Sequence, residues 1–85
     1  METRIAVFGI IVEDTSSVER LNTLLHEHHD YIIGRMGIPC QEYGIQIISV
    51  VVNAPQDTIA ALSGKIGKLN GISVKTAYSK VIVHG

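Results

Sequence analysis

Two segments of the chain are apolar at every other position on both alternations, a pattern expected for strands in the middle of a sheet that is covered on both faces. The first runs from Arg4 to Val12 and the second from Gly44 to Asn53. Their side chains divide into two rows each: Ile5, Val7 and Ile11 against Ala6, Phe8, Ile10 and Val12, and Ile45, Ile47 and Val51 against Ile48, Val50 and Val52. We predict that the two strands lie side by side at the centre of one sheet.

Two weaker strand patterns flank this pair. Tyr31 to Ile38 reads as a shorter strand, and Pro39 to Gly44 supplies the turn that joins it to the central strand as a hairpin, with the shorter strand at an edge. Ile72 to Ser79 alternates as an edge or half-exposed strand, and the apolar tail from Val81 to Val83 either extends it or packs on a neighbour. The predicted inward row of this strand is Ile72, Val74, Thr76 and Tyr78, and the outward row is Ser73, Lys75 and Ser79.

Two segments have the period of amphipathic helices. The first runs from about 16 to 29, with Ser16 and Glu19 spaced as a capping box. The second starts at Asn53-Ala54-Pro55 and closes at Asn70-Gly71, which we expect to act as a C-terminal cap. Their apolar positions are Val18, Leu21, Leu24, Leu25 and His28 in the first helix, and Ile59, Leu62, Ile66 and Leu69 in the second.

The element order β-α-β followed by β-α-β predicts an α+β, ferredoxin-like βαββαβ fold made by residues 1–85 as one domain. Right-handed crossovers place both helices on the same face of a four-stranded antiparallel sheet. The apolar residues on the other face of the two central strands are then left without a cover. We therefore expect a homo-oligomer, a dimer or a tetramer, in which subunits bury that face.

Gly9 interrupts the apolar pattern of the first strand. A glycine inside a strand can mark a β-bulge, a place where another backbone approaches closely, or a local twist. Of the three, a local twist is the plainest account and the one that we expect.

Composition and charge argue against several classes of protein. The formal net charge is -1 and the charged residues are dispersed, which argues against direct binding of nucleic acid through its phosphates. No apolar run approaches the roughly 20 residues of a membrane-spanning helix, and the start of the chain lacks the features of a signal peptide. With a single cysteine, Cys40, an internal disulfide framework is excluded, and we expect a cytoplasmic protein.

The segment from His26 to Asp30 consists entirely of residues with ionisable side chains. His26 and His29 are one helical turn apart and could share a transition metal, with Cys40 or a residue of another subunit completing the coordination sphere. The spacing matches no closed zinc pattern, and the alternative is a solvated polar helix end.

A second candidate site lies where the first strand leads into the first helix. Glu13, Asp14, Thr15 and Ser16 precede free backbone N–H groups of a helix start, and the two acids favour an amino group over an anion there. The alternative is an ordinary helix cap. Arg35, between Gly34 and Met36-Gly37, could anchor a ligand carboxylate or be a plain surface residue.

Because Walker-type glycines, paired catalytic carboxylates, a Ser/His/Asp arrangement and a CxxC motif are all missing from the sequence, we expect no enzyme activity.

Three segments, METRIAVFGIIVED, DYIIGRMGIPCQEYGIQIISVVVNAP and ALSGKIGKLNGISVKTAYSK, together resemble the iron-only hydrogenase system regulators. The most specific part is YIIGRMGIP followed by GIQIISVVV. The resemblance covers nearly the whole chain and implies a fold similar to ACT domains and to the C-terminal domain of the nickel-responsive repressor. It also implies a context of hydrogenase systems in anaerobic bacteria, and it leaves the cofactor unknown.

The chain departs from both related patterns. Ser17 stands where amino-acid-binding ACT domains usually have glycine, so the resemblance does not carry an amino-acid site to this loop. His28-His29-Asp30 matches the opening of the repressor's nickel-binding strand and His26 falls at a bridging ligand, but Gly37 and Pro39 replace its paired histidines. The repressor's separate DNA-binding segment has no counterpart here, so any effect on transcription would need a protein partner.

These observations lead us to expect a non-catalytic regulatory or sensor module, oligomeric and binding a small effector between subunits. Two alternatives stay open. One is a metal-binding protein that uses His26, His29 and Cys40, and the other is a purely structural protein that assembles with components of a hydrogenase system.

Overall fold

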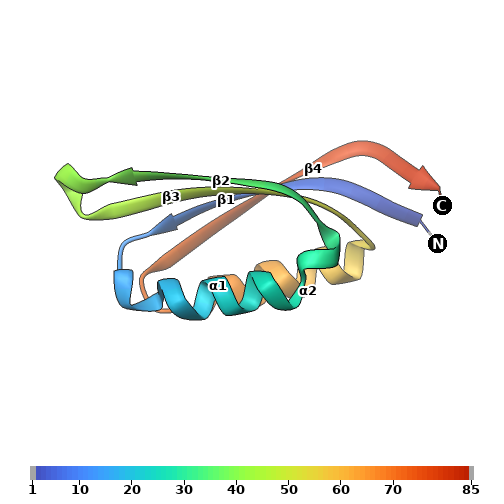
Figure 1. Ribbon diagram of the computed structural model, residues 1–85. Helices are drawn as coiled ribbons and strands as arrows, with labels where there is room; N and C mark the ends of the chain where they lie inside the picture. The colour runs from blue at the N-terminus through green and yellow to red at the C-terminus, as the bar shows by residue number, and fades with distance from the viewer. Residues whose placement is uncertain (1, 85) are drawn as a thin grey trace.

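The computed structural model, which describes residues 2–84, contains one four-stranded antiparallel sheet with both helices on the same face (Figure 1). The order of strands across the sheet is β2-β3-β1-β4. The four strands are β1 (Glu2–Val12), β2 (Ile32–Cys40), β3 (Ile45–Ala54) and β4 (Ile72–His84). The predicted α+β, ferredoxin-like arrangement is confirmed, with the two doubly apolar strands β1 and β3 adjacent at the centre.

The helices are α1 (Val18–Glu27) and α2 (Gln56–Gly67). Short 3₁₀ turns, η1 (Thr15–Ser17), η2 (His29–Tyr31) and η3 (Gln41–Tyr43), connect them to the strands. Among residues 2–84, no helix combines the length and the apolar character needed to cross a lipid bilayer.

The core lies between the sheet and the two helices. Each central strand contributes one of its two apolar rows, and the helices contribute their apolar stripes, so the core is entirely aliphatic apart from Phe8. The buried side chains are Ala6, Phe8, Ile10 and Val12 of β1, Ile48, Val50, Val52 and Ala54 of β3, Leu21 and Leu25 of α1, Ile59, Leu62 and Ile66 of α2, and Ile72 of β4. The alternation in the sequence divides each central strand into two apolar rows, and the structure buries one row of each against the helices.

Both edge strands are longer than the sequence predicts. β2 continues through Pro39 to Cys40, which an edge strand permits because the missing N–H of proline faces away from the ladder. β4 continues through the apolar tail to His84, past an irregularity in its pairing with β1 between Arg4 and Ala6. The tail thus extends the strand. Tyr78, predicted to point inward, is 40% exposed because β4 diverges from α2 toward its C-terminal end (Figure 1).

The start of the first helix differs from the predicted capping box. Ser16 and Glu19 do not cap each other; instead the Asp14 carboxylate caps η1, accepting hydrogen bonds from the Ser16 backbone N–H at 3.0 Å and from the Ser16 hydroxyl at 2.6 Å. An Asp side chain can reach the N–H two residues further on, and this local bond displaces the longer-range box. The α-helix itself then begins only at Val18 and ends at Glu27, two residues before the predicted end.

A second set of contacts joins this loop to the turn after α2. The backbone N–H of Glu13 donates to the Gly71 carbonyl at 2.7 Å, and the buried Ser17 hydroxyl donates to the Asn70 carbonyl at 2.7 Å. Gly71 has φ = 67°, and a Cβ there would lie only 2.3 Å from the Cβ of Asp14. Glycine is therefore required at this position both by conformation and by close packing. The left-handed residue expected after the second helix is present, although α2 ends earlier, at Gly67.

A glycine-to-alanine pair separates these two requirements. Gly44 has the same φ of 67° as Gly71, but a Cβ there would meet no atom within 4 Å. We expect Gly44→Ala to lower the free energy of unfolding by about 1–2 kcal/mol, the cost of a left-handed alanine. Gly71→Ala should cost roughly 1–3 kcal/mol more, because the added methyl group overlaps Asp14. Urea denaturation of both variants measures the difference, and equal losses would show that the Asp14 contact is not tight.

The cap predicts a pH dependence. The hydrogen bond from the Ser16 hydroxyl, and then the one from the Ser16 backbone N–H, hold the pKa of Asp14 below its ordinary value of 3.8. Because the folded-state pKa is the lower one, the stabilisation is present above pH 3.8 and is lost as the pH falls through the folded-state pKa.

Thermal unfolding of the wild type and of Asp14→Asn from pH 6 to pH 2.5 tests this dependence, since asparagine can still cap but carries no charge. The difference in melting temperature should be largest at pH 5–6 and should shrink below about pH 4. A difference that stays constant across this range would mean that the charge of Asp14 does not contribute.

Candidate functional site

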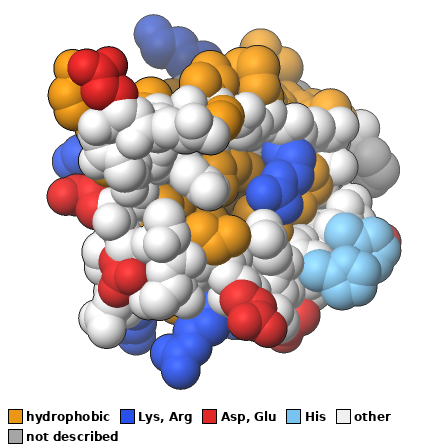
Figure 2. All heavy atoms as spheres, turned by 60° about the vertical axis from the view of Figure 1, so that its left-hand side comes forward, with side chains coloured by type: hydrophobic (Ala, Val, Ile, Leu, Met, Phe, Trp, Pro, Cys, Tyr) orange, Lys and Arg blue, Asp and Glu red, His pale blue; other side chains and the backbone are white. Residues whose placement is uncertain are grey.

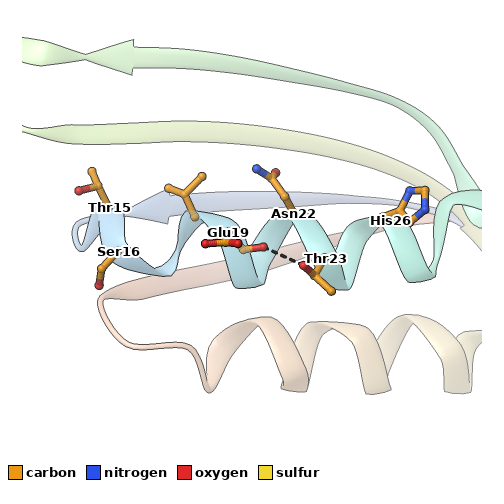
Figure 3. Close-up of a pocket in the computed structure, with 7 residues that line it drawn as sticks. Thr15, Ser16, Glu19, Asn22, Thr23 and His26 are labelled. Carbon is orange, nitrogen blue, oxygen red and sulfur yellow. Dashed lines mark hydrogen bonds between the residues drawn. The ribbon is translucent and has the colours of Figure 1, made fainter.

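A shallow groove runs along the exposed side of α1, and one part of it lies between this helix and the edge strand β2. It has two sections that share Asn22 and His26, and we call the two together the α1 groove. The first section, shown in Figure 3, is lined by Thr15, Ser16, Val18, Glu19, Asn22, Thr23 and His26. The second is lined by Asn22, Leu25, His26, His29, Ile32 and Arg35. The groove therefore offers hydroxyl, carboxylate, amide, imidazole and guanidinium groups beside a few apolar side chains.

The helical period of α1 places these groups. Asn22 and His26 are four residues apart and project from the side of the helix that faces β2 and β3, whereas Thr23 points away (Figure 3). The Thr23 hydroxyl donates to the Glu19 carbonyl at 3.0 Å, so it is occupied by its own helix. Glu19, Asn22 and His26 are the other polar side chains of α1 that line the groove.

Arg35 reaches the groove from the sheet. It lies opposite Val50 in the β2–β3 register, and since Val50 is in the buried row, Arg35 emerges on the helix side of the sheet. Its Nη2 donates to the Asn22 Oδ1 at 3.1 Å, a contact between residues 13 positions apart. This bond orients the guanidinium over α1 and leaves its other N–H groups available to a ligand.

Charges of both signs surround the groove. Figure 2 shows one side of the molecule, on which acidic and basic side chains are interspersed and histidine side chains gather at one edge. With a net charge of -1 for the whole chain, this side has no extended field of one sign. A small ligand with separated charges fits such a surface better than a polyanion.

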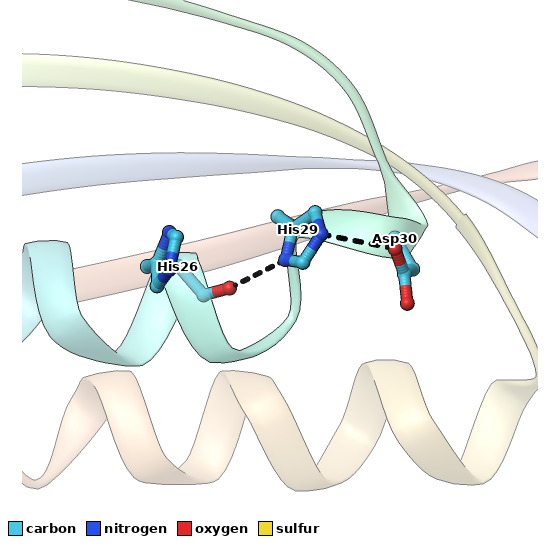
Figure 4. A network of polar contacts seen from close by, with 3 residues as sticks. All are labelled: His26, His29 and Asp30. Atoms are coloured by element: carbon cyan, nitrogen blue, oxygen red, sulfur yellow. Dashed lines mark hydrogen bonds and ion pairs between the residues drawn. The ribbon is translucent and has the colours of Figure 1, made fainter.

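His26 and His29 stack on each other, with ring centroids 5.4 Å apart and the ring planes 19° apart. The Nδ1 of His29 lies 2.9 Å from the His26 carbonyl oxygen, and its Nε2 lies 3.1 Å from an Asp30 carboxylate oxygen (Figure 4). Both ring nitrogens of His29 therefore face oxygen atoms. In this conformation neither nitrogen is directed at a position that His26 could share as a metal ligand.

Cys40 lies away from this pair. It is the last residue of β2, opposite Ile45 at the hairpin turn, whereas His29 precedes the first residue of that strand. A strand rises about 3.3 Å per residue, so Ile32 and Cys40 are about 26 Å apart. One chain thus does not bring Cys40 to the two histidines, and within residues 2–84 no three His, Cys, Asp or Glu side chains are grouped as metal ligands.

The five residues of the predicted ligand site divide between two places. Thr15 and Ser16 line the first section of the groove, and Arg35 lines the second. The Asp14 carboxylate is engaged as the cap of η1, and Glu13 is tied by its backbone to Gly71. Glu19, Asn22 and His26 complete the groove. Their i, i+3, i+7 spacing in the sequence marks a polar face of the helix, but this spacing alone does not show that Arg35 lies against it.

The comparisons with known proteins agree with this fold. The family model TM1266-like, described as "Iron-only hydrogenase system regulator, putative", matches residues 4–76. Among curated proteins there is no significant match. The solved structures that match include a formyltetrahydrofolate deformylase from Pseudomonas putida KT2440, at 14% identity and a TM-score of 0.62. That match covers 86% of this chain but 28% of the deformylase, so it concerns the ACT-like fold alone.

A much closer structural match is the uncharacterized protein TM1266 from Thermotoga maritima. The two share 37% sequence identity and superpose with a TM-score of 0.88, over 92% of this chain and 99% of TM1266. Both the family model and this structure span nearly the whole domain. The chain therefore belongs to the TM1266-like family of iron-only hydrogenase system regulators.

Proposed function

We propose that this protein is a non-catalytic, cytoplasmic, homo-oligomeric regulator of a hydrogenase system that binds a small zwitterionic effector, of the amino-acid class, in the α1 groove. The observation that carries the proposal is the Arg35–Asn22 contact, which fixes a guanidinium from β2 over a helix face that also presents a carboxylate. Family membership supports the regulatory role.

The spacing of charges suits a small zwitterion. Glu19 and Asn22 are three residues apart on α1, a rise of about 5 Å, and Asn22 holds Arg35. Arg35 can bind a carboxylate through two parallel N–H groups, and Glu19 can accept hydrogen bonds from an ammonium group. Leu25 and Ile32 give the second section apolar walls for the body of such a ligand.

The groove is open, so a bound effector would also touch any protein that lies against α1. A ligand changes the affinity of a module for its partner only by contacts that differ between the free and the bound complex. An effector held at the surface supplies such contacts directly. We propose that the protein acts in this way on another subunit or on a protein component of the hydrogenase system, without binding nucleic acid or membrane itself.

A second candidate function rests on the stacked histidine pair. His26 and His29 are exposed and adjacent, so a metal could bind if His29 gave up its contact with Asp30 and a second subunit supplied further ligands such as Cys40. The third candidate, a purely structural interaction protein, would bind neither effector nor metal.

A thermal-shift panel of amino acids, nucleotides and divalent metals, run anaerobically with reductant, distinguishes the three. An effector at 100 times its Kd should stabilise the native state by about 2.7 kcal/mol. The shift should vanish in Arg35→Ala and in Glu19→Gln, and persist in Arg20→Ala, which removes an exposed cation from α1 outside the groove.

Each other outcome of the thermal-shift panel leads to a different conclusion. An amino-acid shift that survives Arg35→Ala would place the effector elsewhere. A shift with nickel, iron or zinc that disappears in His26→Ala would replace the effector proposal with metal binding. No shift with any compound would leave the structural role.

A further inference from the structure

The face of the sheet opposite the helices is apolar and, within residues 2–84, uncovered (Figure 1). The strand registers place one row of each strand on this open face, and five large side chains there are between 37% and 61% exposed. These five are Val7 and Ile11 of β1, Met36 and Ile38 of β2, and Ile47 of β3. Exposed apolar groups that adjoin across three strands form a patch of the kind that soluble proteins bury against another molecule.

Gly9 lies in the middle of this patch. It stands between Val7 and Ile11 along β1, and it is opposite Ser49 on β3 and Lys75 on β4. A glycine and a serine meet here among larger aliphatic side chains, so these rows of β1 and β3 have their smallest side-chain volume at this point, which we call the hollow. Lys75 is the charged residue nearest to the hollow in the registers of β1 with its two neighbours.

The chain itself gives no reason for a glycine at this position. The positive-φ glycines are Gly44 and Gly71, so Gly9 has a backbone conformation that other residues adopt. A Cβ on Gly9 would meet the Lys75 carbonyl oxygen at 3.9 Å, an ordinary contact. The pairing of β1 with β3 runs through Gly9 without a bulge. Glycine inside a strand is unfavourable, so its presence points to something outside the subunit that needs the space.

We propose that a second copy of this chain packs on the open face, sheet against sheet, with Gly9 at the point of closest approach and an aliphatic side chain of the other copy filling the hollow. The inference deepens the homo-oligomer of the proposed function and rests on it. It assigns the interface to one surface and one residue.

Three features favour a second copy as the occupant. In a two-fold symmetric interface the same patch must fit itself, and a hollow bordered by Val7 and Ile11 on the same strand provides both the cavity and the side chains to fill one. The patch has almost no charge with which to select a different partner. The open face as a whole, with the patch on three strands and the Ser73 and Lys75 row of β4 at its rim, spans four strands over about eight residues. It covers about 500 Å² per copy, or about 1,000 Å² for two, the lower limit of a specific interface.

Gly9→Val tests the assignment because it should act in opposite directions on the subunit and on the assembly. Valine suits a strand and finds free space in the subunit, so the circular dichroism spectrum should be unchanged and the isolated subunit at least as stable as the wild type. Self-association measured by sedimentation equilibrium should weaken at least about tenfold, because the added side chain fills the hollow. Gly37→Val is the matched control: Gly37 is opposite Ile48, on the helix side of the sheet, with no atom within 4 Å of its Cβ position.

Each result of these measurements supports or overturns the assignment of the interface to the open face. A Gly9→Val oligomer as tight as the wild type would overturn the assignment while leaving oligomerisation, through another surface, intact. A wild type that sediments at the 9.2 kDa of one chain would overturn both. If Gly9→Val fails to fold, Ile11→Lys supplies the same test by placing a charge on the patch. The effector shift is measured on the same variants, so a loss of assembly is distinguished from a failure of the groove to bind.

Discussion

The structure depends on one constraint: two right-handed β-α-β units deliver both helices to the same side of the sheet, while the two central strands are apolar on both sides. Ala6, Phe8, Ile10 and Val12 are removed from water by the helices, and Val7 and Ile11, which alternate with them, are not. The free energy gained by hydrophobic burial is roughly proportional to the apolar area removed from water. The open row stays exposed in the isolated chain, so the chain does not gain this free energy from it. The alternation that builds the core therefore also leaves an apolar row exposed on the open face.

Because both helices are on one face, the α1 groove and the open face lie on opposite sides of the sheet. The α1 groove is on the helix side, where the first half of β2 passes α1 and brings Arg35 to Asn22. The open face is on the other side, and β2 takes part in both, through Arg35 on one side and through Met36 and Ile38 on the other. An edge strand whose alternate residues belong to two surfaces can connect their occupancy, since a shift of the strand moves both sets of side chains together.

The parts of the fold that could be predicted from the sequence are those that depend on periodicity. The division of β1 and β3 into two apolar rows, the apolar stripes of both helices and the edge position of β2 follow from the sequence pattern, but the pattern does not say which row faces the helices. The start of α1 could not be predicted in this way, because Asp14 and Ser16 compete for the same N–H groups and only local geometry decides between a cap at one and a box at the other. Tyr78 fits the inward alternation of β4 but is exposed, because alternation does not report where a strand diverges from its helix.

The candidate site was predictable only as separate pieces. Arg35, Thr15 and Ser16 stood out as polar residues in short irregular segments, and His26 and His29 as a pair one turn apart. Asn22 did not, because its role depends on the β2–β3 register that carries Arg35 across to α1. Cys40 was named as a possible third ligand, and the extended strand β2 carries it away from His26 and His29 within one chain.

The hydrogen bonds between the loop after β1 and the turn after α2 link the positions of two elements of the fold. Three hydrogen bonds, from the backbone of Glu13 and Asp14 and from the Ser17 hydroxyl, tie the residues before α1 to Asn70 and Gly71, which immediately precede β4. The two crossover connections are thus fastened to each other at one end of the molecule. A tilt of the first turn of α1 would therefore strain the contacts that hold the start of β4, the strand on the opposite edge of the sheet from β2.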